Sequence, residues 1–383
     1  MRVLLAASMG GMGHLLPVLS VGEACQRLGH DVTAVVPESL EAEATRSGFR
    51  VAVGEDPPRA FVDEAWNRMR NGPPDPGLID REVFADKATA GMLGAARAAR
   101  DSFRPHLVVR EPCEYASAVA AHEAGIFQAA VGISLASIER RVLTMVAPVI
   151  DHYAAGVAET IGEAPYLSSF PASLDPSPWP DTRRFSQPIS AAGSLPEWWL
   201  GDDQPLVYVT FGSVTGHLSE AQGVFRAALN AVAGLPCRVL LTVGSGVEVS
   251  EFAPVPANTH VEPWVAQEGV FPHASVVVCH GGSGTTFGAL AAGVPLVVCP
   301  LFADQSENGR LVEESGAGVL VRGREKALGG VGGLDQSDAA PLREAIEEVL
   351  SNPKYRSVAE SISEEMGAAA SLDSIVADLL TAA

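Results

Sequence analysis

The chain has 383 residues, a formal net charge of −20 at pH 7, 47% hydrophobic residues and 19% charged residues. This length exceeds what one hydrophobic core usually serves, so we expect two domains in a globular protein. The strong negative charge disfavours nucleic acid and anionic membranes as partners, and no apolar run approaches the ~20 residues of a membrane-spanning helix.

The first predicted element is a buried strand, Arg2–Ala7, followed by the turn Met9–Gly13 and a helix. The apolar run is interrupted too early for a signal peptide. The five cysteines show no Cys-x-x-Cys pairing, which favours buried thiols in a reducing cytoplasm. The spacing of Gly11 and Gly13 does not fit G-x-G-x-x-G, and no acidic residue closes the second strand, so a dinucleotide-dependent dehydrogenase is disfavoured.

His14 stands at the mouth of this first helix, with Pro17 in the first turn. The helix dipole favours a neutral imidazole, which is the form that a general base needs. The alternative is that His14 only caps the turn.

The segment from Gly54 to Leu78 has no clear period and ends in glycines and prolines, so we predict a binding loop. Phe61, Trp66 and Met69 are candidates for lining an acceptor pocket there, or they pack the loop onto its domain. A long helix is predicted over Ile79–Phe103.

The strand Leu107–Glu111 ends in a carboxylate, at the edge where open α/β sheets bind ligands. Glu111 is therefore a candidate for orienting His14 and stabilising its imidazolium form. Glu114 is a competing candidate, and a plain helix N-terminal charge is the third interpretation.

Prolines crowd residues 170–193, which indicates extended structure between domains. The predicted domains are 1–193 and 205–365, joined by a linker at 194–204, with a C-terminal helix at 366–383. Ser213 follows the strand Leu206–Phe211, and its hydroxyl either donates a hydrogen bond to phosphate or belongs to a plain turn or cap residue. Other strands are predicted at Asp31–Val36, Phe49–Val53, Ile126–Ile133, Cys237–Val243 and His260–Pro263; a helix is predicted over Val142–Ile161.

The stretch Trp264–Asn308 combines a strand (Ala274–Cys279), the turn Gly281-Gly282-Ser283-Gly284, a helix from Thr285 and a further strand. A strand, a glycine turn and a helix N-terminus together form a typical phosphate-binding site, because unpaired N–H groups at the helix N-terminus point at the anion. The aromatic ring of Trp264, upstream of the turn, could stack on a nucleotide base. The carboxylate of Asp304 and the carboxamide of Gln305 could hold sugar hydroxyls, or Asp304 is only the N-cap of its helix. The expected donor-binding residues are Ser213, Trp264, His280, Gly282, Ser283, Gly284, Thr285, Asp304 and Gln305.

Trp264–Asn308 and the N-terminal Gly13-His14-Leu-Leu-Pro17 are similar to the motifs of the UDP-glycosyltransferase-like family, especially its bacterial natural-product glycosyltransferases. The resemblance implies an α/β fold of the GT-B type, with two Rossmann-like domains facing each other across a cleft. It also implies that 1–193 binds the acceptor and that 205–365 binds the nucleotide-sugar donor. It implies inverting sugar transfer without metal or cofactor, His14 as the base, and a last helix that returns to the first domain. Glu111 stands where family members carry an aspartate.

In family members that use UDP-sugars, a glutamate after the phosphate turn accepts hydrogen bonds from the ribose hydroxyls. That position is Gly288 here, which favours a dTDP-sugar over a UDP-sugar, unless Gly288 only lets its helix pack closely. The other expected partners are a hydrophobic small-molecule acceptor and, as a possibility, a second copy in a homodimer.

Two other classes of function compete with a glycosyltransferase. A GT-B phosphorylase needs a lysine for pyridoxal phosphate, and neither Lys326 nor Lys354 is near a phosphate turn. A non-catalytic nucleotide-sugar-binding helper would keep the second motif without needing His14 and Glu111, both of which are present.

Overall fold

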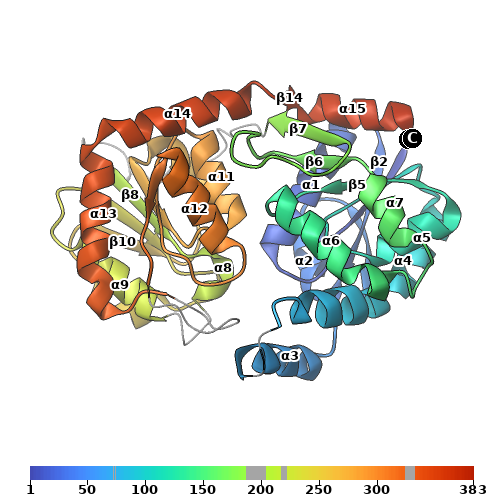
Figure 1. The fold of residues 1–383 in the computed structure, drawn as a ribbon, viewed down its shortest axis with the longest axis horizontal. Coiled ribbons are helices and arrows are strands. Elements are labelled where there is room, and N and C mark those ends of the chain that lie inside the picture. Colours follow the sequence, from blue (N-terminus) through green and yellow to red (C-terminus); the bar gives the residue numbers. More distant parts are fainter. Residues whose placement is uncertain (72, 74, 187–203, 217–221, 324–332) are drawn as a thin grey trace. The chain divides into compact units, whose positions relative to one another are not determined.

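The computed structural model describes residues 1–383 except 72, 74, 187–203, 217–221 and 324–332. The chain divides into two compact units (Figure 1). The first unit contains Met1–Gln187 and Ala369–Ala383, and the second contains Pro188–Ala368. The predicted linker, 194–204, lies outside the described residues except for its last position.

The first unit is built on a parallel sheet with the strand order β14-β7-β6-β5-β4-β1-β2-β3. Its central strands are apolar at consecutive positions, as in Val3–Ala6 and Leu107–Val109, because both faces of the sheet are covered there. The strands are β1 (Arg2–Ala6), β2 (Asp31–Pro37), β3 (Arg50–Gly54), β4 (Leu107–Arg110), β5 (Phe127–Val131), β6 (Tyr166–Ser168), β7 (Thr182–Ser186) and β14 (Ala370–Ser371).

Alternate residues of β1 enter two separate cores. Val3 and Leu5 pack with α1 (Met12–Arg27) and the C-terminal helix α15 (Leu372–Ala382). Leu4 and Ala6 pack with α4 (Thr89–Phe103), α5 (Ala116–Ala124) and α6 (Ala136–Ile150). The helices of this unit are α1 (Met12–Arg27), η1 (Glu38–Leu40), α2 (Glu41–Arg46), α3 (Arg59–Asn71), η2 (Ile79–Ala88), α4 (Thr89–Phe103), α5 (Ala116–Ala124), α6 (Ala136–Ile150), α7 (Val157–Glu163) and α15 (Leu372–Ala382).

The prediction of an irregular loop between Gly54 and Leu78 was wrong, because this segment contains α3. Phe61, Ala65 and Met69 recur every four residues and pack on the start of η2. The helix beyond it also differs from the expected one, since it begins as the ten-residue π-helix η2 and continues as α4. The helix predicted over Val142–Ile161 is two helices, α6 and α7.

The second unit is built on a parallel sheet with the order β10-β9-β8-β11-β12-β13. Its strands are β8 (Leu206–Thr210), β9 (Arg238–Thr242), β10 (Thr259–Glu262), β11 (Val276–Cys279), β12 (Leu296–Val298) and β13 (Gly318–Leu320). Its helices are α8 (Gly212–Thr215), α9 (Gln222–Val232), η5 (Val249–Phe252), α10 (Gln267–Val270), η6 (Phe271–His273), α11 (Ser283–Ala291), α12 (Gln305–Ser315), η7 (Gln336–Asp338), α13 (Ala339–Ser351) and α14 (Pro353–Gly367).

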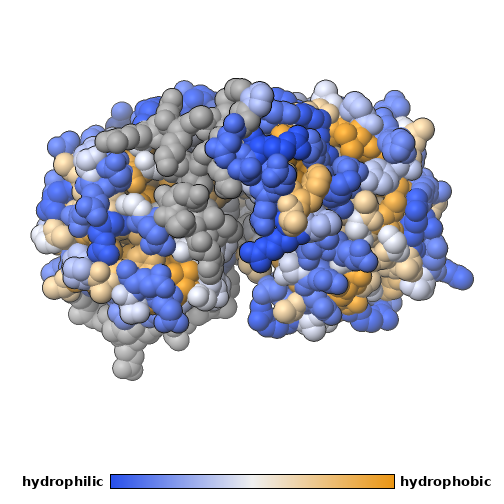
Figure 2. All heavy atoms as spheres, turned by 90° about the horizontal axis from the view of Figure 1, so that it is seen from below, coloured by the Kyte–Doolittle hydropathy of each residue, from blue (hydrophilic) through white to orange (hydrophobic). Residues whose placement is uncertain are grey.

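The surface in Figure 2 is largely hydrophilic, with hydrophobic residues in small separate groups on that face. Within the described part of the chain, every helix is too short or too polar to cross a membrane.

Candidate functional site

The turn between β1 and α1 brings the ring of His14 against the backbone. Gly10 has a φ of +140°, and a Cβ there would lie 2.3 Å from Cδ2 of His14, so only glycine fits. On its other side, the imidazole stacks on Phe84 of η2, with ring centroids 5.6 Å apart and an interplanar angle of 5°. The ring is therefore held by packing, while 18% of the side chain stays exposed.

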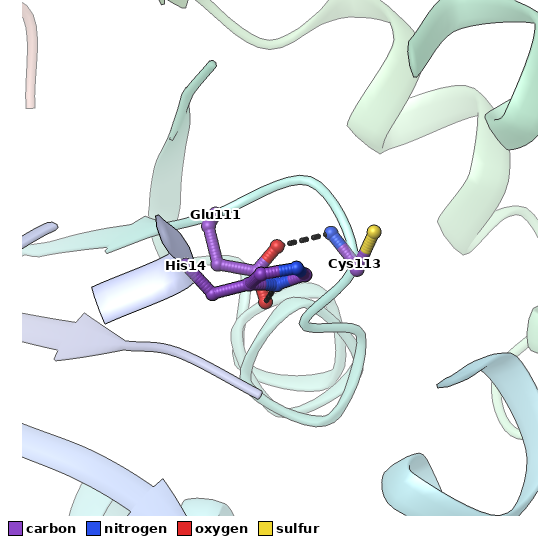
Figure 3. Close-up of side chains that lie close together, drawn as sticks. All are labelled: His14, Glu111 and Cys113. Carbon is purple, nitrogen blue, oxygen red and sulfur yellow. Dashed lines mark hydrogen bonds and ion pairs between the residues drawn. The ribbon is translucent and has the colours of Figure 1, made fainter. Parts of the chain in front are cut away.

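Glu111 directly follows β4, and its carboxylate faces His14 (Figure 3). Nδ1 of His14 lies 3.3 Å from Oε1 of Glu111, which is an ion-pair distance, although Nδ1 makes no well-aligned hydrogen bond with the described residues. The competing candidate Glu114 instead accepts from the N–H of Ser117, at 2.9 and 3.2 Å, at the start of α5. The structure thus places Glu111 rather than Glu114 beside the histidine.

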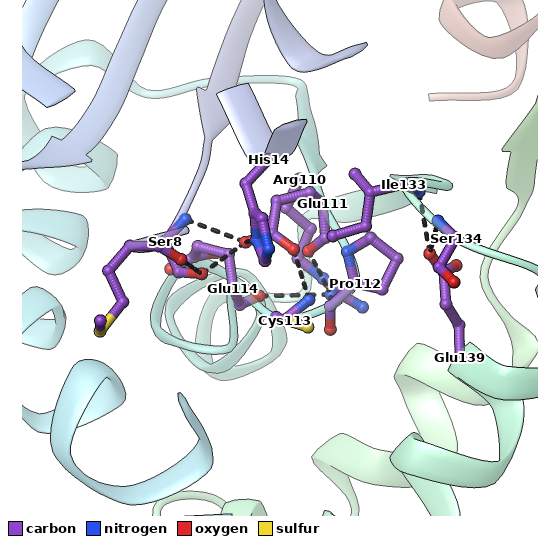
Figure 4. Close-up of polar contacts among 11 residues, drawn as sticks. Ser8, His14, Arg110, Glu111, Pro112, Cys113, Glu114, Ile133, Ser134 and Glu139 are labelled. Atoms are coloured by element: carbon purple, nitrogen blue, oxygen red, sulfur yellow. Dashed lines mark hydrogen bonds and ion pairs between the residues drawn. The ribbon is translucent and has the colours of Figure 1, made fainter. Parts of the chain in front are cut away.

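Three donors hold the buried Glu111 carboxylate (Figure 4). Oε1 accepts from the N–H of Ser8 at 3.0 Å and from the Ser8 hydroxyl at 2.6 Å, and Oε2 accepts from the N–H of Cys113 at 2.5 Å. Burial acts to raise the pKa of Glu111, but His14 and these hydrogen bonds outweigh it and hold the pKa below its usual value. Glu111 is therefore a charged carboxylate next to an imidazole at neutral pH.

The same place holds the one group of potential metal ligands found among the described residues. Ligand atoms of His14, Glu111 and Cys113 all lie within 4.8 Å of one another. Both carboxylate oxygens already accept hydrogen bonds, and burial raises the pKa of the Cys113 thiol well above its ordinary value. Because a metal needs the thiolate, these residues suit proton transfer better than metal binding.

The three candidate acceptor residues all lie on α3, but they are not equivalent. Phe61 and Met69 pack in a small cluster with η2 that also contains Met9 and Phe84, and Trp66 is about one third exposed. Since Phe84 stacks on His14, this cluster makes the surroundings of the histidine apolar.

In the second unit, the predicted donor residues follow the carboxyl ends of neighbouring strands. Thr210 of β8 pairs with Cys279 of β11, which in turn pairs with Val298 of β12. The turns after these strands therefore meet at one edge of the sheet, where open α/β sheets bind ligands.

His280 joins two of these turns. A Cβ at Gly212 would lie 2.8 Å from its Nε2, and one at Gly282 would lie 2.5 Å from the same atom, so the ring fills the space beside both glycines. Burial lowers the pKa of His280 to about 4, and Nδ1 makes no hydrogen bond with the described residues. The imidazole is thus neutral at physiological pH.

A network of side chains ties the glycine turn to the start of α12. Ser283 donates from Oγ to Asp304 at 2.8 Å. The buried Asn308 donates to the carbonyl of Gly281 at 2.8 Å, to Oγ of Ser283 at 3.0 Å and to the carboxylate of Asp304 at 3.3 Å. Asp304 therefore lies directly beside the turn.

Gln305 and Thr285 have structural partners as well. Oε1 of Gln305 accepts from the N–H groups of Leu301 and Phe302, at 2.9 and 3.0 Å, so this buried side chain holds the loop after β12. Thr285 donates from Oγ1 to Gln267 at 3.1 Å.

The remaining donor candidates offer accessible groups. Trp264, just beyond β10, is 61% exposed, and Ser213 and Gly284 are exposed as well. Gly282 is the N-cap of α11, whose first turn has no side-chain cap. The N–H groups in the first turn of α11 are thus not capped by a side chain.

Reasoning from sequence missed four residues that the structure brings to these sites. Asn308 had a usable signal, because it lies four residues after Asp304 on the same helix face. Ser8, Phe84 and Gln267 had none, since their partners are far away in the chain or belong to unpredicted elements.

Comparison with known proteins finds similarity to glycosyltransferases and to the C-terminal domain of one protein family. Residues 226–382 match the erythromycin biosynthesis protein CIII-like, C-terminal domain. A PGL/p-HBAD biosynthesis glycosyltransferase of Mycobacterium tuberculosis is 32% identical over 192 residues, which are 49% of this chain and 40% of that protein. The chain thus spans well under half the length of this relative. Demethyllactenocin mycarosyltransferase of Streptomyces fradiae is 28% identical over 336 residues, 79% of this chain and 72% of that protein.

Among solved structures, the spinosyn rhamnosyltransferase SpnG matches with a TM-score of 0.79 at 21% identity and covers 100% of both chains. A second structure of SpnG is a complex with thymidine diphosphate. The predicted GT-B fold and the predicted resemblance to bacterial natural-product glycosyltransferases are confirmed.

Proposed function

We propose that this chain is an inverting, metal-independent glycosyltransferase that moves a sugar or deoxysugar from a nucleoside diphosphate to an apolar natural-product acceptor. The observation that carries the proposal is the pair of His14 and Glu111, with 3.3 Å between Nδ1 and Oε1. A buried charged carboxylate behind an imidazole is the arrangement that lets histidine act as a general base.

The reaction that these residues support is a single displacement. His14 takes the proton of the acceptor hydroxyl, and the acceptor oxygen forms a bond to the anomeric carbon. The bond from that carbon to the diphosphate oxygen breaks, and the configuration inverts. Glu111 stabilises the imidazolium that forms. The apolar cluster on α3 and η2 suits a hydrophobic acceptor.

The second unit supplies the groups for the leaving diphosphate. The uncapped N–H groups at the start of α11 form an anion site, and His280 and Ser213 add side-chain donors. The hydroxyl proton of Thr285 is directed to Gln267, so Thr285 can contribute only if that bond is exchanged for one to the diphosphate. The exposed Trp264 is the candidate for stacking on the base, and Asp304, beside the glycine turn, is with Gln305 the candidate for binding the sugar. These groups supply the charge stabilisation that a metal ion would otherwise provide, so transfer is expected to continue in excess chelator. A strict requirement for Mg²⁺ or Mn²⁺ would refute this part of the proposal.

For the nucleotide, we propose dTDP over UDP. Position 288 carries no carboxylate for a ribose 2′-hydroxyl, and a Cβ there would lie 2.8 Å from a ring carbon of the buried Phe271. The close approach of Phe271 supports the interpretation that Gly288 lets its helix pack closely. The same glycine also leaves a ribose 2′-hydroxyl without a carboxylate acceptor at this position. The complex of SpnG with thymidine diphosphate points in the same direction. Competition between the two nucleoside diphosphates as inhibitors tests the preference, and equal inhibition by UDP and dTDP would contradict it.

The decisive experiment compares His14→Ala with His273→Ala, an exposed histidine of the second unit, as the matched control. Loss of a general base should lower the rate of transfer by about a hundredfold or more. Donor binding should be nearly unchanged, because His14 belongs to the other unit from the glycine turn. Product formation by chromatography and donor affinity by calorimetry give the two readouts. Near-normal turnover of His14→Ala at neutral pH would refute the assignment.

A further inference from the structure

We propose that Ser8 is a positioning residue that holds the carboxylate of Glu111 against His14 and thereby sets the basicity of the imidazole. This inference rests on the proposed function, because it concerns how the same histidine is made an effective base.

The geometry makes Ser8 the principal anchor of one carboxylate oxygen. Its N–H and its hydroxyl both donate to Oε1 of Glu111, at 3.0 and 2.6 Å, and Oε1 is also the oxygen that faces His14. The hydroxyl lies farther from its other acceptor, the carbonyl of Met9, at 3.2 Å. Since a hydroxyl has one proton, the shorter contact to the charged group is the preferred bond.

Sheet register explains why residues so distant in sequence meet. Ala6 pairs with Arg110 across β1 and β4, and the N–H of Glu111 donates to the carbonyl of Ala6 at 3.2 Å. Ser8, which is 2% exposed, follows two residues later and reaches the Glu111 side chain at the same sheet edge.

The need for such an anchor follows from the side chain of glutamate. Glutamate has one more rotatable side-chain bond than aspartate, so the carboxylate of Glu111 can adopt more positions than that of an aspartate could. Ser8 and the N–H of Cys113 select one of them by holding both oxygens. The same donors favour the charged form, and this charge stabilises the imidazolium of His14.

Several titratable or charged groups interact electrostatically with Glu111, so that their pKa values and that of Glu111 influence one another. They are His14, Arg110, Cys113, Glu114, Tyr115 and Glu139.

The test is Ser8→Ala in the full chain. Ser20→Ala is the matched control, because the Ser20 hydroxyl donates to the carbonyl of Leu16 on the same helix. The loss of one hydrogen bond to a charged group should lower kcat by about tenfold. The KM for the donor should not change. The acidic limb of the pH–rate profile should move to lower pH, because the imidazolium loses part of its stabilisation; a purely structural role would leave this limb in place.

A double-mutant cycle shows whether Ser8 acts through Glu111. Adding Ser8→Ala to a Glu111→Gln variant should cost almost nothing further, and a full second loss would overturn the proposal. Wild-type kcat together with a wild-type pH profile in Ser8→Ala would overturn it as well.

A further readout does not depend on turnover. Infrared difference titration of the Glu111 carboxylate, with Glu111→Gln as the blank, should show a higher pKa in Ser8→Ala than in the wild type. Absence of transfer by the wild type would refute the proposed function, whereas an unchanged carboxylate titration would refute the role of Ser8.

Discussion

At the scale of single residues, the carboxylate of Asp304 is held by two other side chains beside the glycine turn. Ser283 and Asn308 both donate to Oδ2. The preceding residue, Ala303, has a φ of +56°, a left-handed conformation that a non-glycine residue rarely adopts. A strained residue next to a held carboxylate is typical of functional sites, and it favours a role for Asp304 in binding over that of a plain cap.

Replacing Asp304 with alanine should weaken use of the sugar donor much more than binding of the bare nucleoside diphosphate, because the carboxylate is expected to bind sugar hydroxyls. The measurement pairs kcat/KM for the donor with inhibition by the diphosphate. Glu307→Ala, on the first turn of the same helix, is the control. Equal losses for donor and diphosphate would assign Asp304 to the turn rather than to the sugar.

The buried Glu139 makes stability depend on pH. Its oxygens accept from the N–H groups of Ile133 and Ser134 and from the hydroxyl of Tyr166, at 2.8, 2.7 and 2.6 Å. Burial, only partly offset by these donors, raises the pKa of Glu139 to about 8. Between its ordinary pKa and this value, the folded state holds a proton that the unfolded state has lost, so the free energy of unfolding should fall as pH rises.

Denaturant unfolding across this pH range should therefore show a declining stability in the wild type and a flatter profile in Glu139→Gln. The amide is uncharged at every pH and keeps a carbonyl acceptor for the donors. Parallel profiles for the two proteins would show that Glu139 does not carry the effect.

At the scale of elements, the C-terminal helix α15 is part of the first unit's core (Figure 1). Leu372, Ile375, Val376, Leu379 and Leu380 pack in the same core as α1, and Asp373 pairs with Arg27 at 2.6 Å. An exposed ion pair contributes little, so the apolar stripe of the helix holds it in place.

Leu379→Ala should consequently lower the free energy of unfolding by about 2–5 kcal/mol, because the side chain is fully buried and leaves a cavity. Thr381→Ala, on the exposed side of the same helix, should stay within about 0.5 kcal/mol of the wild type. Urea unfolding of both variants provides the measurement. Similar midpoints for the two would mean that α15 adds nothing to the unit.

At the scale of the whole molecule, the net charge of −20 opposes the approach of an anionic donor. In the proposed donor site, helix N–H groups and neutral side chains such as His280, rather than a basic patch, bind the anionic diphosphate. Raising the salt concentration from about 20 to about 200 mM should screen the repulsion and lower the KM for the donor. The KM for an uncharged acceptor serves as the control. A donor KM that rises with salt would indicate an attractive basic site instead.

Local sequence patterns were sufficient for much of the fold and for selecting the candidate site residues. Buried parallel strands are apolar at consecutive positions and end at glycine or polar residues, so β1, β4, β8, β11 and β12 could be predicted with their turns. His14, Glu111 and the turn Gly281–Gly284 were found because each directly follows such a strand or turn.

Only the tertiary structure decided which partner each of these residues has. Ser8 meets Glu111 through the register of β1 and β4, and Phe84 meets His14 through a π-helix that no periodicity indicated. Gly288 packs against Phe271, and Asn308 closes the glycine turn onto Asp304. The physical reason is that a strand, turn or helix is encoded by neighbours in the sequence. Hydrogen bonds and ring contacts within a site depend on strand register and helix packing, which join residues far apart in the chain.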